Sequence, residues 1–142
     1  MTIAEHLRDF FRTCPMLKNK RIDIDCLSEH ADSFSIDADP GETSVKRYLD
    51  GSSVRRNVFY LSGRTYYGDD LKQQAQNIAC FEQIEEWMEQ QNLLHNQPDL
   101  GNMRSVRTFH ALTAGYPYVI NEDTGLARYQ ITLELIYTQE VF

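Results

Sequence analysis

The sequence predicts an α+β fold, in which an antiparallel β-sheet carries two main helices on one face. Two segments with helical periodicity, near residues 2–13 and 71–91, indicate the helices. Residues 127–138 place apolar side chains on one face and, apart from Ile136, polar side chains on the other, which is typical of a strand with one wet face. An antiparallel sheet covered by helices on its other face explains both patterns. The expected order is α-β-β-β-α-β-β, with one further short strand at 45–49.

The length indicates a single domain, residues 1–142. A chain of 142 residues can bury roughly 70% of its unfolded surface and needs no metal or disulfide to fold. Its three cysteines are odd in number and far apart, which suits a reducing compartment. No run approaches the roughly 18 apolar residues of a membrane span, and residues 1–6 do not resemble the start of a signal peptide. We therefore expect a cytoplasmic protein with no membrane partner.

The balance of charge is acidic. Fourteen Lys and Arg residues against 21 Asp and Glu residues give a formal net charge of −7. A charge of this sign repels phosphate at long range, and it disfavours a nucleic-acid-binding module of the usual basic kind.

Residues 2–13 are expected to form the first helix. Thr2 and Glu5 match a capping box, in which the two side chains satisfy free amides at the start of a helix. Pro15 ends the helix. One stripe of its surface is apolar and consists of Ile3, Leu7, Phe10, Phe11 and Cys14.

Two strands with one polar face follow, at residues 21–27 and 33–39. Their inward residues are Ile22, Ile24, Cys26, Phe34, Ile36 and Ala38. The link at 29–32 is short enough for an antiparallel pair. A polar loop or hairpin extension is expected at about 39–53. Residues 54–67 then form a long strand that is apolar on both faces in its middle, which indicates a central strand.

The second helix is expected from residue 71 to about residue 91, capped by Asp69 and Asp70. Its apolar positions cover about half of the circumference, which is wider than the usual stripe of about 100°, and Trp87 lies outside this arc. A loop at 92–102 and a strand at 103–114 follow. Turns at 115–118 and 121–125 precede the closing strand.

No motif in the sequence indicates catalysis, and we expect a protein that is not an enzyme and has no cofactor or metal. The four histidines have no neighbour at metal-ligand spacing, and G-x-S-x-G, P-loop and G-x-G-x-x-G patterns are absent. Residues 37–42 lack the ligand order of a calcium loop. Cys26 or Cys80 could act as a nucleophile only with a histidine partner that sequence cannot place.

Aromatic residues are the remaining signal. The chain has eight Tyr, seven Phe and one Trp, and aromatic side chains are enriched at protein interfaces because they combine apolar area with a polar atom. The wide arc of the second helix and the outlying Trp87 predict a surface buried by another subunit. The residues expected at this subunit interface are Phe81, Trp87, Tyr66 and Tyr67.

Two stretches resemble tail-terminator and head–tail joining proteins of long-tailed bacteriophages. Residues 77–91 contain an N-x3-F-E-x-I-x2-W run, formed by Asn77, Phe81, Glu82, Ile84 and Trp87, which resembles a helix of those proteins. The turn at 111–116 and the strand at 127–137 are similar to their closing strand. Such chains are often labelled minor capsid proteins in prophages of Gram-positive bacteria.

The resemblance implies a structural protein of the virion tail or neck, present in the host cytoplasm during assembly. Similar proteins form a hexameric ring that completes the tail tube and docks to the head connector. Their sheet faces a lumen through which DNA passes as cargo, and their helices lie outside. The tail-tube and head-connector proteins would be its partners.

Two regions are expected to serve this role. An acidic lumen would let DNA slide, because DNA binding depends on cationic contacts to phosphate. The candidate lumen residues are Asp23, Asp25, Asp37, Asp39 and Glu134. The extension at 39–53 is a candidate docking loop, because loops often carry recognition. Its candidate residues are Glu42, Lys46, Arg47 and Asp50.

Other classes of function remain open at this point. One is a small cytosolic enzyme or ligand-binding α+β domain with a cleft between sheet and helices. Another is an acidic adaptor that binds a basic partner. The sequence does not decide between a tail-side and a head-side role, or between a monomer and a ring in isolation.

Overall fold

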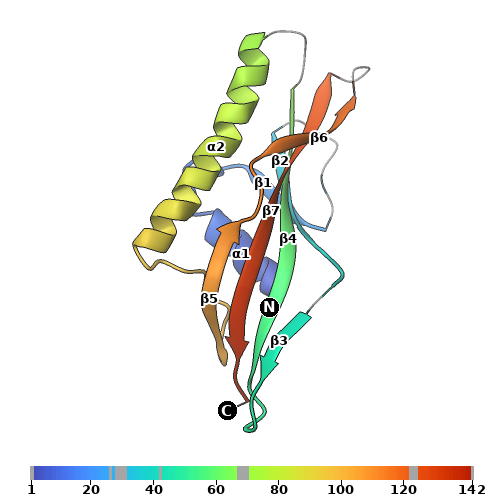
Figure 1. Cartoon of the computed structure of the whole chain (residues 1–142). Helices are drawn as coiled ribbons and strands as arrows, with labels where there is room; N and C mark the ends of the chain where they lie inside the picture. The colour runs from blue at the N-terminus through green and yellow to red at the C-terminus, as the bar shows by residue number, and fades with distance from the viewer. Residues whose placement is uncertain are drawn as a thin grey trace.

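The computed structural model describes residues 2–25, 27, 32–41, 43–66, 71–121 and 125–141. Within these residues it has an α+β fold with two helices and one mixed sheet of seven strands. The elements are α1 (Ile3–Phe11), β1 (Arg21–Ile24), β2 (Ser33–Ala38), β3 (Thr43–Arg47), β4 (Ser53–Tyr66), α2 (Leu71–Leu93), β5 (Arg104–Ala111), β6 (Tyr116–Asn121) and β7 (Leu126–Gln139). The strand order is β1-β2-β4-β7-β5, with β3 added on β4 and β6 added on β7 (Figure 1).

The two longest strands, β4 and β7, form the spine of the sheet. Each has 14 residues, and they pair antiparallel along their full length, from Ser53 opposite Gln139 to Tyr66 opposite Leu126. The predicted inner face of the closing strand is confirmed, since every second side chain from Ala127 to Tyr137 is buried. The central position predicted for the long strand is also confirmed, because β4 lies between β2 and β7.

Both helices pack on the same face of the sheet, as predicted. Thr2 caps α1, and its Oγ1 accepts a hydrogen bond of 3.2 Å from the Glu5 amide. Phe11 of α1 packs edge-on against Phe109 of β5, with ring centroids 5.9 Å apart. Phe81 of α2 stacks on Tyr129 of β7 at 5.2 Å. These contacts join helices and sheet into one apolar core.

The expectation that the first two strands pair antiparallel is wrong. β1 and β2 are parallel, with Arg21 opposite Ser33 and Ile24 opposite Ile36. The direction of β2 is set by β4, to which all six of its residues pair antiparallel. The chain must therefore return to the start of β1 before β2 begins, and a direct hairpin is excluded. The expected inward residue Cys26 lies outside the described residues.

The turn expected at 115–118 is also wrong, because β6 begins at Tyr116 and pairs with β7. Proline lacks the amide hydrogen of a strand and is tolerated at edges and bulges. Pro117 satisfies both conditions, since β6 is an edge strand whose register shifts between Pro117 and Val119. The helix cap expected at Asp69 and Asp70 lies outside the described residues.

Glycine at position 63 is required by close packing between β4 and α2. A Cβ atom there would lie 2.7 Å from Cε1 of Phe34 and 2.9 Å from Cζ of Phe81. We expect Gly63→Ala to lower the free energy of unfolding by about 1–3 kcal/mol, because overpacking a core displaces its neighbours. Urea denaturation measures this change.

Gly41→Ala is the matched control. Its added Cβ would meet only Asp39 Oδ1 at 3.4 Å, so we expect a change below about 0.5 kcal/mol. Equal stabilities of the two variants would contradict the packing described here.

Candidate functional site

The sheet face opposite the helices is a polar surface, here called the open face. The strand register places Asp23, Ser35, Ser62, Gln130 and Tyr116 in one row across β1, β2, β4, β7 and β6. Ser35 and Ser62 are completely buried, and Gln130 is nearly so. Buried polar groups are costly unless they are hydrogen-bonded. The open face therefore depends on a network of side-chain bonds.

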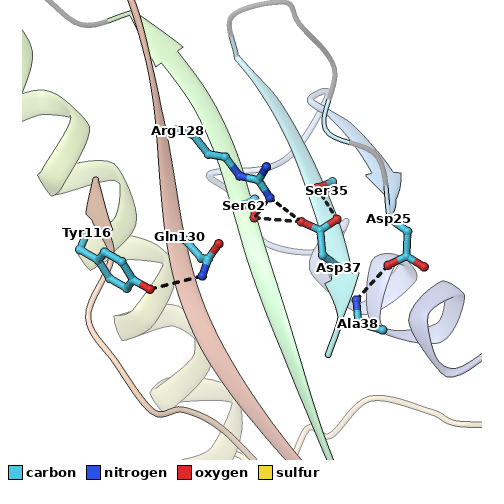
Figure 2. Close-up of polar contacts among 8 residues, drawn as sticks. All are labelled: Asp25, Ser35, Asp37, Ala38, Ser62, Tyr116, Arg128 and Gln130. Atoms are coloured by element: carbon cyan, nitrogen blue, oxygen red, sulfur yellow. Dashed lines mark hydrogen bonds and ion pairs between the residues drawn. The ribbon is translucent and has the colours of Figure 1, made fainter. Parts of the chain in front are cut away.

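Asp37 of β2 is the centre of this network (Figure 2). Its carboxylate accepts hydrogen bonds from Ser35 Oγ at 2.9 Å and from Ser62 Oγ at 3.1 Å. The guanidinium of Arg128, on β7, donates to Asp37 Oδ2 at 2.9 Å and to Ser62 Oγ at 3.2 Å. Three strands are thus connected through one carboxylate. Beside them, Gln130 Nε2 donates to the hydroxyl of Tyr116 at 3.3 Å.

A second ion pair lies further along β7. Arg56 of β4 donates to the carboxylate of Glu134, which also contacts Nε2 of His110 at 3.4 Å. At the edge of the sheet, Arg21 Nε lies 2.8 Å from Asp23 Oδ2. Each acid of the open face that the structure describes on β1, β2 and β7 therefore has an arginine partner.

Arg64 adds a positive charge to this face. It lies directly opposite Arg128 in the β4–β7 register, and like charges in such positions repel. Its Nε is buried and has no hydrogen-bond partner within the described part of the chain. Asp37 offsets this repulsion, because it neutralises Arg128.

The five predicted lumen acids are therefore not a free acidic surface. Asp23, Asp37 and Glu134 lie on the open face, each with an arginine. The other two bond to backbone amides: Asp25 accepts from Ala38 N at 2.9 Å, and Asp39 accepts from Gly41 N at 3.0 Å. The sequence does not show which groups face these acids. Their position in a lumen stays a prediction.

The structure changes the expected subunit interface. Phe81 is 1% exposed between Phe34 and Tyr129, so it belongs to the core and its assignment to an interface is wrong. Trp87 is half-buried against Phe10, with ring centroids 5.0 Å apart. Of the apolar arc of α2, Phe81, Ile84 and Met88 are buried in the core, whereas Ile78 is 45% exposed. Tyr66 remains available at 60% exposed, and Tyr67 lies outside the described residues.

The expected extension is a projecting hairpin, here called the β3–β4 hairpin, residues 43–56. Its turn is closed by a hydrogen bond of 2.9 Å from Tyr48 N to Ser52 O. Asp50 accepts hydrogen bonds from the hydroxyl and amide of Ser52, which lower the pKa of Asp50 and make it a turn residue. Lys46 and Arg47 are exposed, while Glu42 lies outside the described residues.

An open pocket of about 240 Å³ lies between α2 and the end of β5. It is lined on the helix side by Glu85, Met88, Glu89 and Asn92, and on the other side by residues 110–114. Burial raises the pKa of Glu85, and the nearby carboxylates Glu82 and Glu89 raise it further, while the Gly115 amide donates to it and lowers it. The volume lies below the roughly 300–1,000 Å³ of typical ligand pockets.

Cys14 and Cys80 do not have the environment of nucleophiles, and Cys26 lies outside the described residues. Burial raises the pKa of Cys14 and of Cys80, which disfavours the reactive thiolate. In the described residues, no three His, Cys, Asp or Glu side chains are grouped to hold a metal ion. No helix in that part of the chain is long and apolar enough to cross a membrane.

No model of a known protein family matches the sequence, and a comparison with curated proteins finds no relative. We therefore infer the function from the surfaces described above.

Removing the charge of Asp37 tests the open-face network. We expect Asp37→Asn to destabilise the fold by about 1–3 kcal/mol, because Arg128, which lies opposite Arg64, loses the carboxylate that neutralises it. Adding Arg64→Gln should restore part of the loss. Asp9→Asn, which removes an exposed acid near Arg12, should change stability by less than about 0.5 kcal/mol. Denaturation at neutral pH measures all three, and no coupling between positions 37 and 64 would contradict the network.

The lowered pKa of Asp39 predicts that the stability of the fold depends on pH in the acid range. Hydrogen bonds from the Gly41 amide and the Tyr60 hydroxyl lower its pKa below the ordinary 3.8. A lowered carboxyl pKa stabilises the fold above the unfolded-state pKa, and this stabilisation is lost as the pH falls through the folded-state pKa. We expect Asp39→Asn to be less stable than the natural protein at pH 7, with the difference shrinking as the pH falls below 3.8 and vanishing below the lowered pKa of Asp39. A difference that persists in acid would contradict this role.

Proposed function

We propose that this protein is a structural component of a long-tailed bacteriophage, at the tail terminus or the head–tail junction. It acts as a closed, hexameric ring of identical copies that completes the tail and docks to the head. Tail-tube and head-connector proteins are its partners, and DNA passes through the ring as cargo. Its place is the virion, reached by assembly in the host cytoplasm.

The observation that carries this proposal is the chemistry of the open face. A wall beside passing DNA must not bind phosphate strongly, and protein–DNA affinity depends on free cationic contacts. Arg21, Arg56 and Arg128 are on this face, but a carboxylate of the same chain engages each of them. The surface is preformed and polar, and these three arginines are already neutralised. These properties support a lining role.

The two edges of the sheet also suit a ring. β1 and β3 lie on the β4 side, whereas β5 and β6 lie on the β7 side. The two edges of the sheet therefore present different strands. A contact that joins the edge of one copy to the opposite edge of the next would be head-to-tail. Such contacts form a ring when the rotation between copies closes.

Particle assembly tests this function. A prophage that carries the gene is induced with and without an in-frame deletion of it, and the lysates are compared by electron microscopy. We expect the deletion to leave heads and tails unjoined, and the gene supplied in trans to restore complete particles. Purified protein should form sixfold rings alone or on isolated tails.

Two outcomes would contradict the proposal. One is a normal yield of complete particles without the gene. The other is a persistent monomer that binds a small metabolite in the pocket between α2 and β5, which would favour a ligand-binding domain instead.

A further inference from the structure

Two parts of the chain have opposite net charge. The β3–β4 hairpin has four basic residues and one acidic residue, in a chain whose net charge is −7. Helix α2 has the reverse composition, with four acidic residues and one basic residue. The acidic residues of α2 are Glu82, Glu85, Glu86 and Glu89, here called the acidic helix face.

The glutamates of the acidic helix face repel one another. Glu82 and Glu86, and likewise Glu85 and Glu89, are four residues apart, and like charges at this spacing destabilise a helix. Among the described residues, no lysine or arginine forms an ion pair with any of them. This contrasts with the open face, where Asp23, Asp37 and Glu134 each have an arginine. A cationic partner from outside the chain would relieve the repulsion.

The hairpin is the complementary surface. Lys46 and Arg47 are exposed and form no ion pair in the described part of the chain. Lys46 Nζ lies only over the ring of Tyr48, 5.2 Å from its centroid. The hairpin also carries apolar side chains in water, with Val45 58% exposed and Leu49 fully exposed.

Apolar residues lie beside the acidic helix face as well. Leu93 and Leu94, at the end of α2, are 81% and 72% exposed. Leu112 is exposed at the rim of the pocket that Glu85 and Glu89 line. Neighbouring exposed apolar residues mark interaction surfaces more often than isolated ones do. Both surfaces therefore combine apolar side chains with charges of opposite sign.

The two surfaces cannot meet within one chain. β3 pairs with the first residues of β4, at the end of the sheet where β7 finishes. Figure 1 shows the hairpin projecting from that end, whereas α2 lies along the other part of the sheet and beside β5. Their contact requires two copies.

We propose that the β3–β4 hairpin of one copy docks on the acidic helix face of the next copy. Lys46 and Arg47 pair with the glutamates around the pocket between α2 and β5, and the hairpin tip packs on Leu93, Leu94 and Leu112. The contact joins two different surfaces, so it repeats head-to-tail. This inference rests on the proposed ring and names the interface that closes it.

Reversing the charge of each surface separately tests the contact. The hairpin variant is Lys46→Glu with Arg47→Glu, and the helix variant is Glu86→Lys with Glu89→Lys. Neither variant should assemble alone, with association weakened at least tenfold. A mixture should recover assembly, because both kinds of contact in an alternating ring would again join opposite charges. Sedimentation velocity and native mass spectrometry measure the particles formed.

A matched control reverses two exposed cations elsewhere. Arg12→Glu with Lys18→Glu changes the net charge as much as the hairpin variant does, and it should assemble like the natural protein. Circular dichroism checks that each variant is folded. If the natural protein forms rings and both reversed variants do so equally well, the docking inference is wrong and the proposed ring stands.

A second measurement covers assembly that requires the phage tail. A photo-crosslinking amino acid at position 49 should, in assembled particles, label residues 82–94 of another copy. Crosslinks only to other proteins would overturn the inference but leave the proposed function in place. A chain that is absent from particles and monomeric in isolation would overturn both.

Discussion

The fold depends on the full-length antiparallel pairing of β4 and β7. Because successive side chains of a strand point to opposite faces, a shift of one strand by one residue would move its apolar side chains from the core to the open face. The apolar set on β7 must therefore face the helices, and Arg128 and Glu134 must then lie on the opposite face. The remaining strands extend this pair at its edges, and both helices cover the one apolar face.

This pairing divides the molecule into regions of different chemical character. On the open face, carboxylates bond to arginines and hydroxyls of neighbouring strands. By contrast, the β3–β4 hairpin and the acidic end of α2 expose charged and apolar side chains to water. A protein whose open face is neutralised by its own residues, while its hairpin and the end of α2 expose charged and apolar side chains, is suited to assembly with copies of itself.

Local patterns were enough to predict much of the fold, but not the features that depend on distant partners. The cap at Thr2, the helix ending near residue 91 and the buried face of β7 follow from neighbouring residues and are confirmed. The direction of β1 relative to β2 is set by β4, and β6 is tolerated because Pro117 lies at a bulge of an edge strand. Neither cause is visible in a short window.

The site was predicted less well for the same reason. The arginine partners of Asp37 and Glu134 lie on other strands, far away in the sequence, so alternation showed the acids but not their neutralisation. The wide apolar arc of α2 predicts a subunit interface that includes Phe81, whereas Phe81 packs in the core against Tyr129. The basic hairpin and acidic helix were both present in the sequence, and only the fold shows that they point to different ends.

A cryo-electron microscopy reconstruction of the assembled particle tests most directly the claim that this protein works through surfaces shared with its own copies. The account predicts a closed ring in which the open face lines the lumen, the helices lie outside, and each hairpin contacts α2 of the next copy. Single copies bound separately, or an open face buried against another protein, would contradict it.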